Sequence, residues 1–368
     1  MMRIGELAGQ VGPTAGQSMV GLIRRLFPIF RSITGEGVRT TLDVLGENLP
    51  LARHDVASGT RVLDWVVPQE WTIRDAYVAD GDGRRVIDVR DSNLHLLHYS
   101  VPVRRRMSLA ELRPHLHTLP EHPDWIPYRT SYYRRTWGFC LRHRDLERLP
   151  AGDYEVVIDS ELGPGHLSYG ELLIPGESER EVLLSTHICH PSLANDNLSG
   201  VAVLAELAAR LMRAERRYSY RLLFIPGTIG AITWLARNQE HVGRVDHGLV
   251  LAGVGDRGPL TYKRSYAGDR VVDRAAQHVL SHAKDAHRLL DFRPDGYDER
   301  QFNSPGFRLP VGRLSRSEHG TYPEYHTSAD DLEFITAGAL EGSLRAVLEI
   351  LAVLEENALW RNTAPLGE

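Results

Sequence analysis

The stretch 182–207 reads VLLSTHICHPSLANDNLSGVAVLAEL, and it decides the fold of this 368-residue chain. It opens with a short apolar run at 182–185 and closes with helically spaced apolar residues, among them Val201, Leu204 and Leu207. A short continuous apolar run is typical of a strand that is covered on both faces, and the later spacing is typical of a helix. The polar residues between them are therefore predicted to form a loop from the end of a strand to the start of a helix.

Strands and helices alternate on both sides of this stretch. Apolar runs predict strands at 171–174, 182–185, 221–225 and 248–254, and helical spacing predicts helices at 17–32, 38–47, 197–214, 270–285 and 337–356. This alternation predicts an α/β fold with three layers, in which helices cover a mostly parallel or mixed sheet. Ligands of such sheets bind at the carboxyl ends of strands, and 186–200 is the most polar loop of that kind.

The region from about 60 to 159 has a different texture. Short runs rich in β-branched and aromatic residues occur at 62–67, 71–78, 86–88 and 154–159, separated by Gly, Asp and Pro. We therefore predict a smaller β-rich insertion domain over 59–159 and a core formed by 1–58 and 160–368. Its end is rich in aromatic residues that either line a pocket or fill the small domain's core: Tyr128, Tyr132, Tyr133, Trp137 and Phe139. Tyr133 and Trp137 are the candidates for contact with a substrate.

Composition restricts the partners and the location. The net charge is −5 with both signs interspersed, so no extended basic face for nucleic acid or anionic lipid is expected. We expect a small-molecule or peptide partner, and self-association into a homo-oligomer stays open. Only Cys140 and Cys189 are present, which gives no disulfide framework and favours a reducing cytoplasm. The sequence has no run of about 18 apolar residues, so no membrane span is predicted.

The loop after the second predicted strand carries two imidazoles and a carboxylate within ten residues. These are His187, His190 and Asp196. Imidazole and carboxylate groups are ligand types that suit zinc. The alternative for Asp196 and its neighbour Asn197 is helix capping, because short polar side chains satisfy the free N–H groups of a first helical turn.

This stretch resembles the metal-binding segment of zinc aminopeptidases with the di-zinc phosphorylase/hydrolase-like fold. The resemblance is closer to a poorly characterised subgroup of aminopeptidase-like proteins, which share SYYRRTWGFC at 131–140 and DERQFNSPGF at 298–307. It covers most of residues 60–335 and implies an aminopeptidase-like core. It also implies that His187 and Asp196 are metal ligands, and that His326, in PEYHTSADD at 323–331, is the last one.

The chain departs from that family at positions that bind the metal or transfer protons. Cys189 stands where an Asp orients the first His, and Gly227 and Thr228 stand where two Glu residues serve as general base and as metal ligand. A further ligand Asp is missing near 252–253, and Asp256 is displaced from that position. We therefore expect one zinc ion held by His187, Asp196 and His326. Whether His190 replaces or joins His187 stays open.

Glu299 is the candidate for the missing general base, and its alternative is an ion pair with Arg300 or Arg313. Tyr325 is the candidate donor to a developing oxyanion. Lys263 is a candidate for binding a substrate carboxylate, with a solvated lysine as the alternative. Weaker candidates for a role in proton transfer are His190, Glu318, His319 and Glu324.

The sequence therefore predicts a zinc-dependent amide or peptide hydrolase of aminopeptidase type, acting on a small substrate in specialised, natural-product metabolism. Gly227 favours an alternative, a catalytically degenerate protein that keeps the pocket for a metal or a ligand. A single-zinc acyl transferase or cyclase is a third hypothesis, because glutaminyl cyclases resemble this fold. Gly227 also has a purely structural alternative, namely a turn that needs a positive φ angle.

Overall fold

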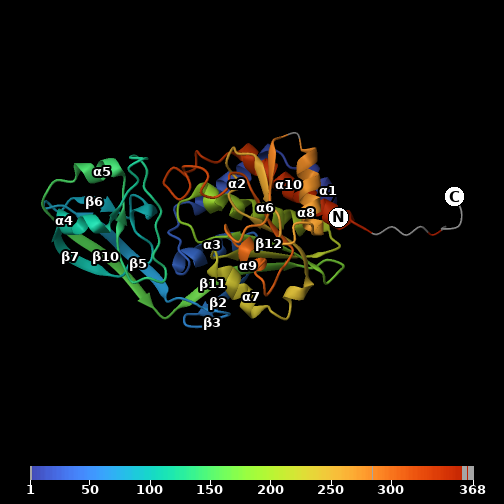
Figure 1. The fold of residues 1–368 in the computed structure, drawn as a ribbon, viewed down its shortest axis with the longest axis horizontal. Coiled ribbons are helices and arrows are strands. Elements are labelled where there is room, and N and C mark those ends of the chain that lie inside the picture. The colour runs from blue at the N-terminus through green and yellow to red at the C-terminus, as the bar shows by residue number, and fades with distance from the viewer. Residues whose placement is uncertain (1, 284, 359–362, 364–368) are drawn as a thin grey trace.

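The computed structural model describes residues 2–283, 285–358 and 363, and it shows a large α/β lobe beside a smaller β-rich lobe (Figure 1). The large lobe is built on an eight-stranded sheet of order β17-β16-β18-β15-β12-β14-β11-β2. In that order the strands are His287–Leu290, Leu260–Lys263, Val311–Ser315, Val245–Leu251, Glu181–His187, Ser219–Ile225, His166–Ile174 and Ala52–Ala57.

The middle of this sheet is parallel. β12 pairs in parallel with both β14 and β15, and β15 pairs in parallel with β18. Antiparallel pairing occurs further out, between β16 and β18, between β11 and β14, and between β11 and β2. The carboxyl ends of β14, β12, β15 and β18 therefore lie at one edge of the sheet, which brings the loops that follow them together.

Helices cover both faces of the sheet. Alternate residues of β12 point to opposite faces. Val182 and Leu184 belong to one hydrophobic cluster with residues of α1, α2, α3, α6, α8 and α10, whereas Leu183 belongs to a second cluster with residues of α7 and α9. Figure 1 shows α10 and α7 on opposite sides of the central sheet. In chain order these helices are Ile4–Gly9, Pro13–Leu26, Glu36–Gly46, Gly200–Leu211, Ile229–Arg237, Val271–His282, Glu299–Phe302 and Ala337–Glu356. Helix, sheet and helix form the three layers that the sequence predicts.

Several predicted bounds shift for identifiable reasons. The helix predicted at 17–32 is α2, which begins at Pro13, in the first turn where proline needs no N–H partner, and ends before Pro28. The helix predicted at 197–214 begins only at Gly200, because the preceding backbone is not helical. The strand predicted at 248–254 is β15, and Gly253 beyond its end adopts a φ of +61° that a strand does not allow.

The β-rich lobe is an antiparallel four-stranded sheet of order β6-β5-β10-β7. Its strands are Arg85–Asp88, Glu70–Ala79, Asp153–Gly163 and Val103–Ser108, and the short helices α4 (Leu109–Leu112) and α5 (His143–Arg148) lie beside them. One hydrophobic cluster runs from Trp71 and Val156 in this lobe to Ile225 and Ile229 in the large lobe. The predicted domain limits, 59 and 159, stay a prediction. Among the described residues, no helix is long and apolar enough to span a bilayer.

Candidate metal centre

The loop between β12 and α6 is held by backbone and side-chain contacts from two other segments. The backbone N–H groups of Asn195 and Asp196 donate to the Asp330 carboxylate at 2.5 and 2.8 Å. Burial raises the pKa of Asp330 to about 8, and the two backbone donors act in the opposite direction. The Asn195 side chain accepts from Gly255 N–H and donates to Asp256, at 2.9 Å in each case. These contacts fix the direction in which Asp196 points.

Neither Asp196 nor Asn197 caps the following helix, so the capping alternative is wrong. The cap position of α6 is Ser199, and no side-chain cap bond is made there. Asn197 Nδ2 instead donates to Thr186 Oγ1 at 2.8 Å and lies 3.2 Å from His187 Nδ1. Asn197 thus contacts the Nδ1 ring nitrogen of His187.

Asp196 lies between two imidazoles from distant parts of the chain. Its Oδ1 is 2.9 Å from His187 Nε2, and its Oδ2 is 3.0 Å from His326 Nε2. Within the described chain, Asp196 Oδ2 and His326 Nε2 have no hydrogen bond of acceptable geometry, although both atoms are buried. Both atoms can bind a metal ion. Two such buried atoms that face each other without a hydrogen bond fit ligands of one metal ion.

His190 joins this group. One ligand atom from each of His187, His190 and Asp196 lies within 4.8 Å of the others. The His190 ring centroid is 4.8 Å from that of His187 and 5.1 Å from that of His326. The structure therefore brings together the three residues predicted as ligands and places His190 beside them, and the ligand role of each stays a prediction. The close spacing of His187 and His190 in the sequence was the signal for His190.

The charges of the cluster suit a cation. Burial alone would raise the pKa of Asp196, but the three nearby imidazoles outweigh it and hold that pKa well below its usual range. Burial lowers the pKa of His190 well below its usual value, which keeps the ring in the neutral form that binds metals. Burial raises the pKa of the Cys189 thiol to about 12, so Cys189 stays a neutral thiol. Three imidazoles and one carboxylate fit zinc.

Aromatic side chains surround the cluster. Tyr325 stacks on His326 with centroids 4.0 Å apart, and Tyr297 stacks on His187 at 5.0 Å. The β-rich lobe contributes Tyr128, whose ring meets His326 edge-on at 5.1 Å and whose backbone N–H donates to the His326 carbonyl at 2.7 Å. The insertion region therefore helps to position a predicted metal ligand.

The aromatic residues proposed for substrate contact lie in different surroundings. Tyr133 is half exposed and donates through its hydroxyl to the Val66 carbonyl at 3.3 Å. The Trp137 ring stacks on His115 within the β-rich lobe, with centroids 3.6 Å apart. Their substrate roles stay a prediction, as does the oxyanion role of Tyr325.

Gly227 and Thr228 form the turn between β14 and α7. A Cβ added at Gly227 would lie 3.6 Å from His187 Cβ and 3.5 Å from Cys189 Sγ, which are ordinary contacts. Gly227 has no positive φ angle, and it is Thr228 that adopts one, at +62°. The structural explanation of this glycine by a positive φ angle is therefore wrong. The turn faces His187 but carries no carboxylate.

Glu299 lies in a buried ion-pair network. Its Oε1 accepts from Lys263 Nζ at 3.0 Å and from Arg313 Nη1 at 3.2 Å, and all three side chains are buried. Lys263 also contacts Asp295 at 3.1 Å, so it is not a solvated lysine. This geometry favours the ion-pair alternative for Glu299 over a role as general base, and the roles of both residues remain predictions.

Asp298, the residue before Glu299, contacts the turn formed by Gly227 and Thr228. Asp298 Oδ1 accepts a hydrogen bond from Thr228 N–H at 2.6 Å, and the Asp298 side chain is buried. Asp298 lies in the segment 298–307, but the sequence does not indicate this contact, because the residue follows the Gly227 turn by about seventy positions.

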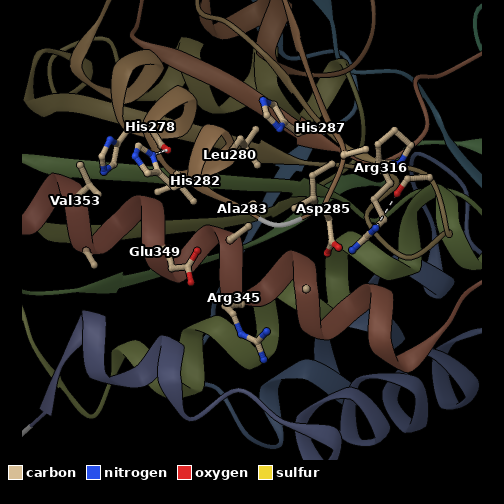
Figure 2. Close-up of a pocket in the computed structure, with 18 of the residues that line it drawn as sticks. His278, Leu280, His282, Ala283, Asp285, His287, Arg316, Arg345, Glu349 and Val353 are labelled. Atoms are coloured by element: carbon tan, nitrogen blue, oxygen red, sulfur yellow. Dashed lines mark hydrogen bonds between the residues drawn. The ribbon is translucent and has the colours of Figure 1, made fainter.

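A separate cavity of about 1120 Å³ lies between α8 and α10 (Figure 2). Its lining includes His278, His282, Arg345 and Glu349, and Arg316 at its edge donates to the Gly258 carbonyl at 2.7 Å. Over the described part of the chain, none of the four metal-centre residues lines this cavity. It is therefore separate from the metal centre.

Comparisons with known proteins identify relatives of this chain. A protein of Clostridium acetobutylicum, provisionally named a polysaccharide biosynthesis protein with an aminopeptidase-like domain, is 49% identical over 353 residues, which cover 96% of this chain and 81% of that protein. A crystal structure of a Clostridium acetobutylicum protein, provisionally described as a peptidase, is 48% identical with a TM-score of 0.97 and covers 99% of this chain and 86% of that one.

More distant structures share the fold alone. A zinc aminopeptidase from Bacillus subtilis has a TM-score of 0.66 at 13% identity, over 91% of this chain and 94% of that one. The predicted aminopeptidase-like α/β fold is thereby confirmed. A family model described as "Domain of unknown function (DUF4910)" matches residues 20–357. Since that match spans most of the sequence, the chain belongs to the DUF4910 family.

Proposed function

We propose that this chain is a zinc-dependent amide hydrolase of aminopeptidase type that acts on a small substrate. The observation that carries the proposal is the Asp196 carboxylate, which faces His187 and His326 at 2.9 and 3.0 Å within an aminopeptidase-like fold. Asp196 Oδ2 and His326 Nε2 lie 3.0 Å apart without a hydrogen bond, and with His190 beside them they support a bound cation in this place.

The residues around the cluster suit hydrolysis of an amide. His187, His190, Asp196 and His326 would hold zinc, which when bound supplies Lewis-acid polarisation of the scissile carbonyl. Burial raises the pKa of Tyr325, so its hydroxyl stays protonated and can donate to a developing oxyanion. The rings of Tyr128, Tyr297 and Tyr325 limit the access of bulk water, which strengthens electrostatic interactions with a substrate.

The experiment measures zinc content and turnover on the same preparation, purified without a chelator or a metal-binding tag. We expect about one zinc per chain, since one ligand cluster is proposed. The substrate panel consists of aminoacyl amides, dipeptides and N-acyl amino acids, together with N-acetylated amino sugars, because the relative's name refers to polysaccharide biosynthesis. Hydrolysis that is lost on chelation and restored by zinc supports the proposal, and a zinc-loaded protein inactive on the whole panel contradicts it.

A second candidate function is a degenerate enzyme that binds a ligand without turning it over. The turn at Gly227 and Thr228 favours it, because neither residue supplies the carboxylate found there in zinc aminopeptidases. The single-zinc acyl transferase or cyclase is a further proposal that product analysis separates from hydrolysis, since hydrolysis alone incorporates oxygen from water into the acyl product. Location in the cytoplasm, a role in specialised metabolism and self-association stay predictions.

A further inference from the structure

A carboxylate reaches the Gly227 turn from another part of the fold. Thr228 N–H donates to Asp298 Oδ1 at 2.6 Å, so one oxygen of this carboxylate is fixed against the turn. The other oxygen, Oδ2, is buried and has no hydrogen-bond partner among the described residues. A buried carboxylate oxygen without a partner is costly unless a ligand, water or ion occupies the space that it faces.

Two observations place the turn and the segment that carry this hydrogen bond beside the metal cluster. A Cβ at Gly227 would lie 3.6 Å from His187 Cβ, so the turn that holds Asp298 faces His187 directly. The residue before Asp298 is Tyr297, whose ring stacks on His187 with centroids 5.0 Å apart. Asp298 therefore approaches His187 from the segment before α9, at the turn where a glutamate is missing.

Burial and nearby charges act on the Asp298 carboxyl in opposite directions. Burial is the largest influence and raises the pKa of Asp298 to about 6, while His187 and the Thr228 N–H act in the opposite direction. Glu299 raises this pKa further and Arg300 lowers it.

The neighbouring carboxylate, that of Glu299, is held in ion pairs. Glu299 Oε1 accepts from both Lys263 and Arg313, whereas the ion pairs of the described chain include none made by Asp298. The two adjacent acidic residues thus have different surroundings, one fixed in a salt-bridge network and one facing the metal cluster.

We propose that Asp298 is the general base of this enzyme, an inference that rests on the hydrolase function proposed above. Its Oδ2 takes a proton from a water molecule while the water oxygen forms a bond to the carbonyl carbon of the amide. The C–N bond then breaks and the proton passes from Asp298 to the leaving nitrogen. The products are a carboxylic acid and an amine, and Asp298 is ionised again.

The test is Asp298→Asn, which keeps the size of the side chain and an oxygen that accepts from Thr228. We expect kcat to fall by about 10² to 10⁴, the range typical of lost acid–base catalysis, with zinc content and Tm unchanged. The fall of kcat/KM at acidic pH, which reports protonation of the base in the free enzyme, is expected to disappear. Asp295→Asn is the matched control, because Asp295 lies on the same segment with a half-exposed side chain paired to Lys263.

A second variant keeps the proposal falsifiable if Asp298→Asn loses stability. Gly227→Glu in the Asp298→Asn background places a carboxylate on the same turn, in space where a Cβ makes ordinary contacts. We expect it to recover at least about tenfold in rate, a modest part of the usual acid–base contribution. Recovery by a carboxylate at another position excludes a purely structural role for Asp298.

The outcomes separate this inference from the function on which it rests. Wild-type protein with full zinc and no turnover on the panel refutes the hydrolase and, with it, this role. Wild-type turnover that Asp298→Asn retains, or that falls without recovery by Gly227→Glu, refutes the role of Asp298 alone. Asp295→Asn losing as much rate as Asp298→Asn would also refute it, because the effect would then not be specific to the carboxylate at the turn.

Discussion

Two loops at the same edge of the central sheet differ in what they carry. The loop after β12 holds Asp196 through backbone bonds to Asp330 and holds His187 through Asn197, so its ligands are fixed from several sides. The turn after β14 carries Gly227 and Thr228, and its nearest carboxylate belongs to Asp298 from a later segment. If the two proposals above hold, metal binding and proton transfer are supplied by separate segments, and substitutions should affect the two properties independently.

Asp196→Asn should have the largest effect. Asp196 is the carboxylate that faces both His187 and His326, and its loss leaves only imidazoles to hold the proposed cation. We expect zinc to be lost and the hydrolysis rate to fall by at least about 10³, while far-ultraviolet circular dichroism stays that of the wild type. The measurement is zinc per chain by elemental analysis beside turnover on the panel described above.

His326→Ala should also lose zinc, and Asp295→Asn serves as the control for both variants. Retention of zinc by either ligand variant would show that a ligand has been wrongly assigned. Unfolding of Asp196→Asn would show instead that Asp196 mainly stabilises the loop, and the separation between the two loops would then fail.

Glu299→Gln should mainly change stability. The substitution leaves the buried cations of Lys263 and Arg313 without their shared carboxylate. Breaking a buried ion pair from one side typically costs about 3 kcal/mol or more, which we expect to see in urea unfolding of the zinc-loaded protein. The matched control is Glu318→Gln. Glu318 Oε1 lies 3.6 Å from Nη2 of Arg293, whose side chain is largely exposed. Loss of this ion pair should therefore lower the free energy of unfolding by less than about 1 kcal/mol. A stable Glu299→Gln variant with a lost acid limb in its rate profile would return the base role to Glu299.

The sequence predicts best what depends on local periodicity. The helix predicted at 337–356 has those bounds as α10, because regularly spaced apolar residues such as Leu340, Leu344 and Leu351 must face the core throughout its length. His187 and Asp196 could be singled out as candidate ligands because they lie within ten residues of each other, between a predicted strand and a predicted helix. Their assignment as ligands comes from the family resemblance and stays a prediction.

Contacts between distant segments were not predictable in this way. The approach of Asp298 to Thr228 depends on how the segment before α9 packs against the turn after β14, and neither segment has a pattern that names the other. The edge-on contact of Tyr128 with His326 likewise joins the β-rich lobe to a loop about two hundred residues later. Such pairs are set by tertiary packing of the whole chain.

Gly200→Ala should destabilise the protein by a smaller amount than Glu299→Gln. Gly200 is the first residue of α6, and a Cβ there would lie 2.5 Å from the Leu251 carbonyl oxygen and 2.6 Å from Asn197 Oδ1. Alanine favours a helix, but the clash with backbone must move α6 away from the sheet. We expect a net loss of about 1–3 kcal/mol in urea unfolding. An unchanged stability would show that the loop after β12 is more adaptable than its contacts indicate.

Gly227→Ala should have the smallest effect and the opposite sign. The added Cβ makes only ordinary contacts with His187 and Cys189, and the backbone of Gly227 has no positive φ angle. Replacing glycine where its conformation suits alanine reduces the freedom of the unfolded chain, which typically stabilises a protein by about 0.4–1 kcal/mol. Urea unfolding of Gly227→Ala beside Gly200→Ala and wild type measures the difference. A loss of more than about 1 kcal/mol in Gly227→Ala would show that the fold requires glycine at this turn. The missing glutamate would then be explained by packing, and Gly227→Glu would no longer be a sound way to restore a carboxylate beside His187.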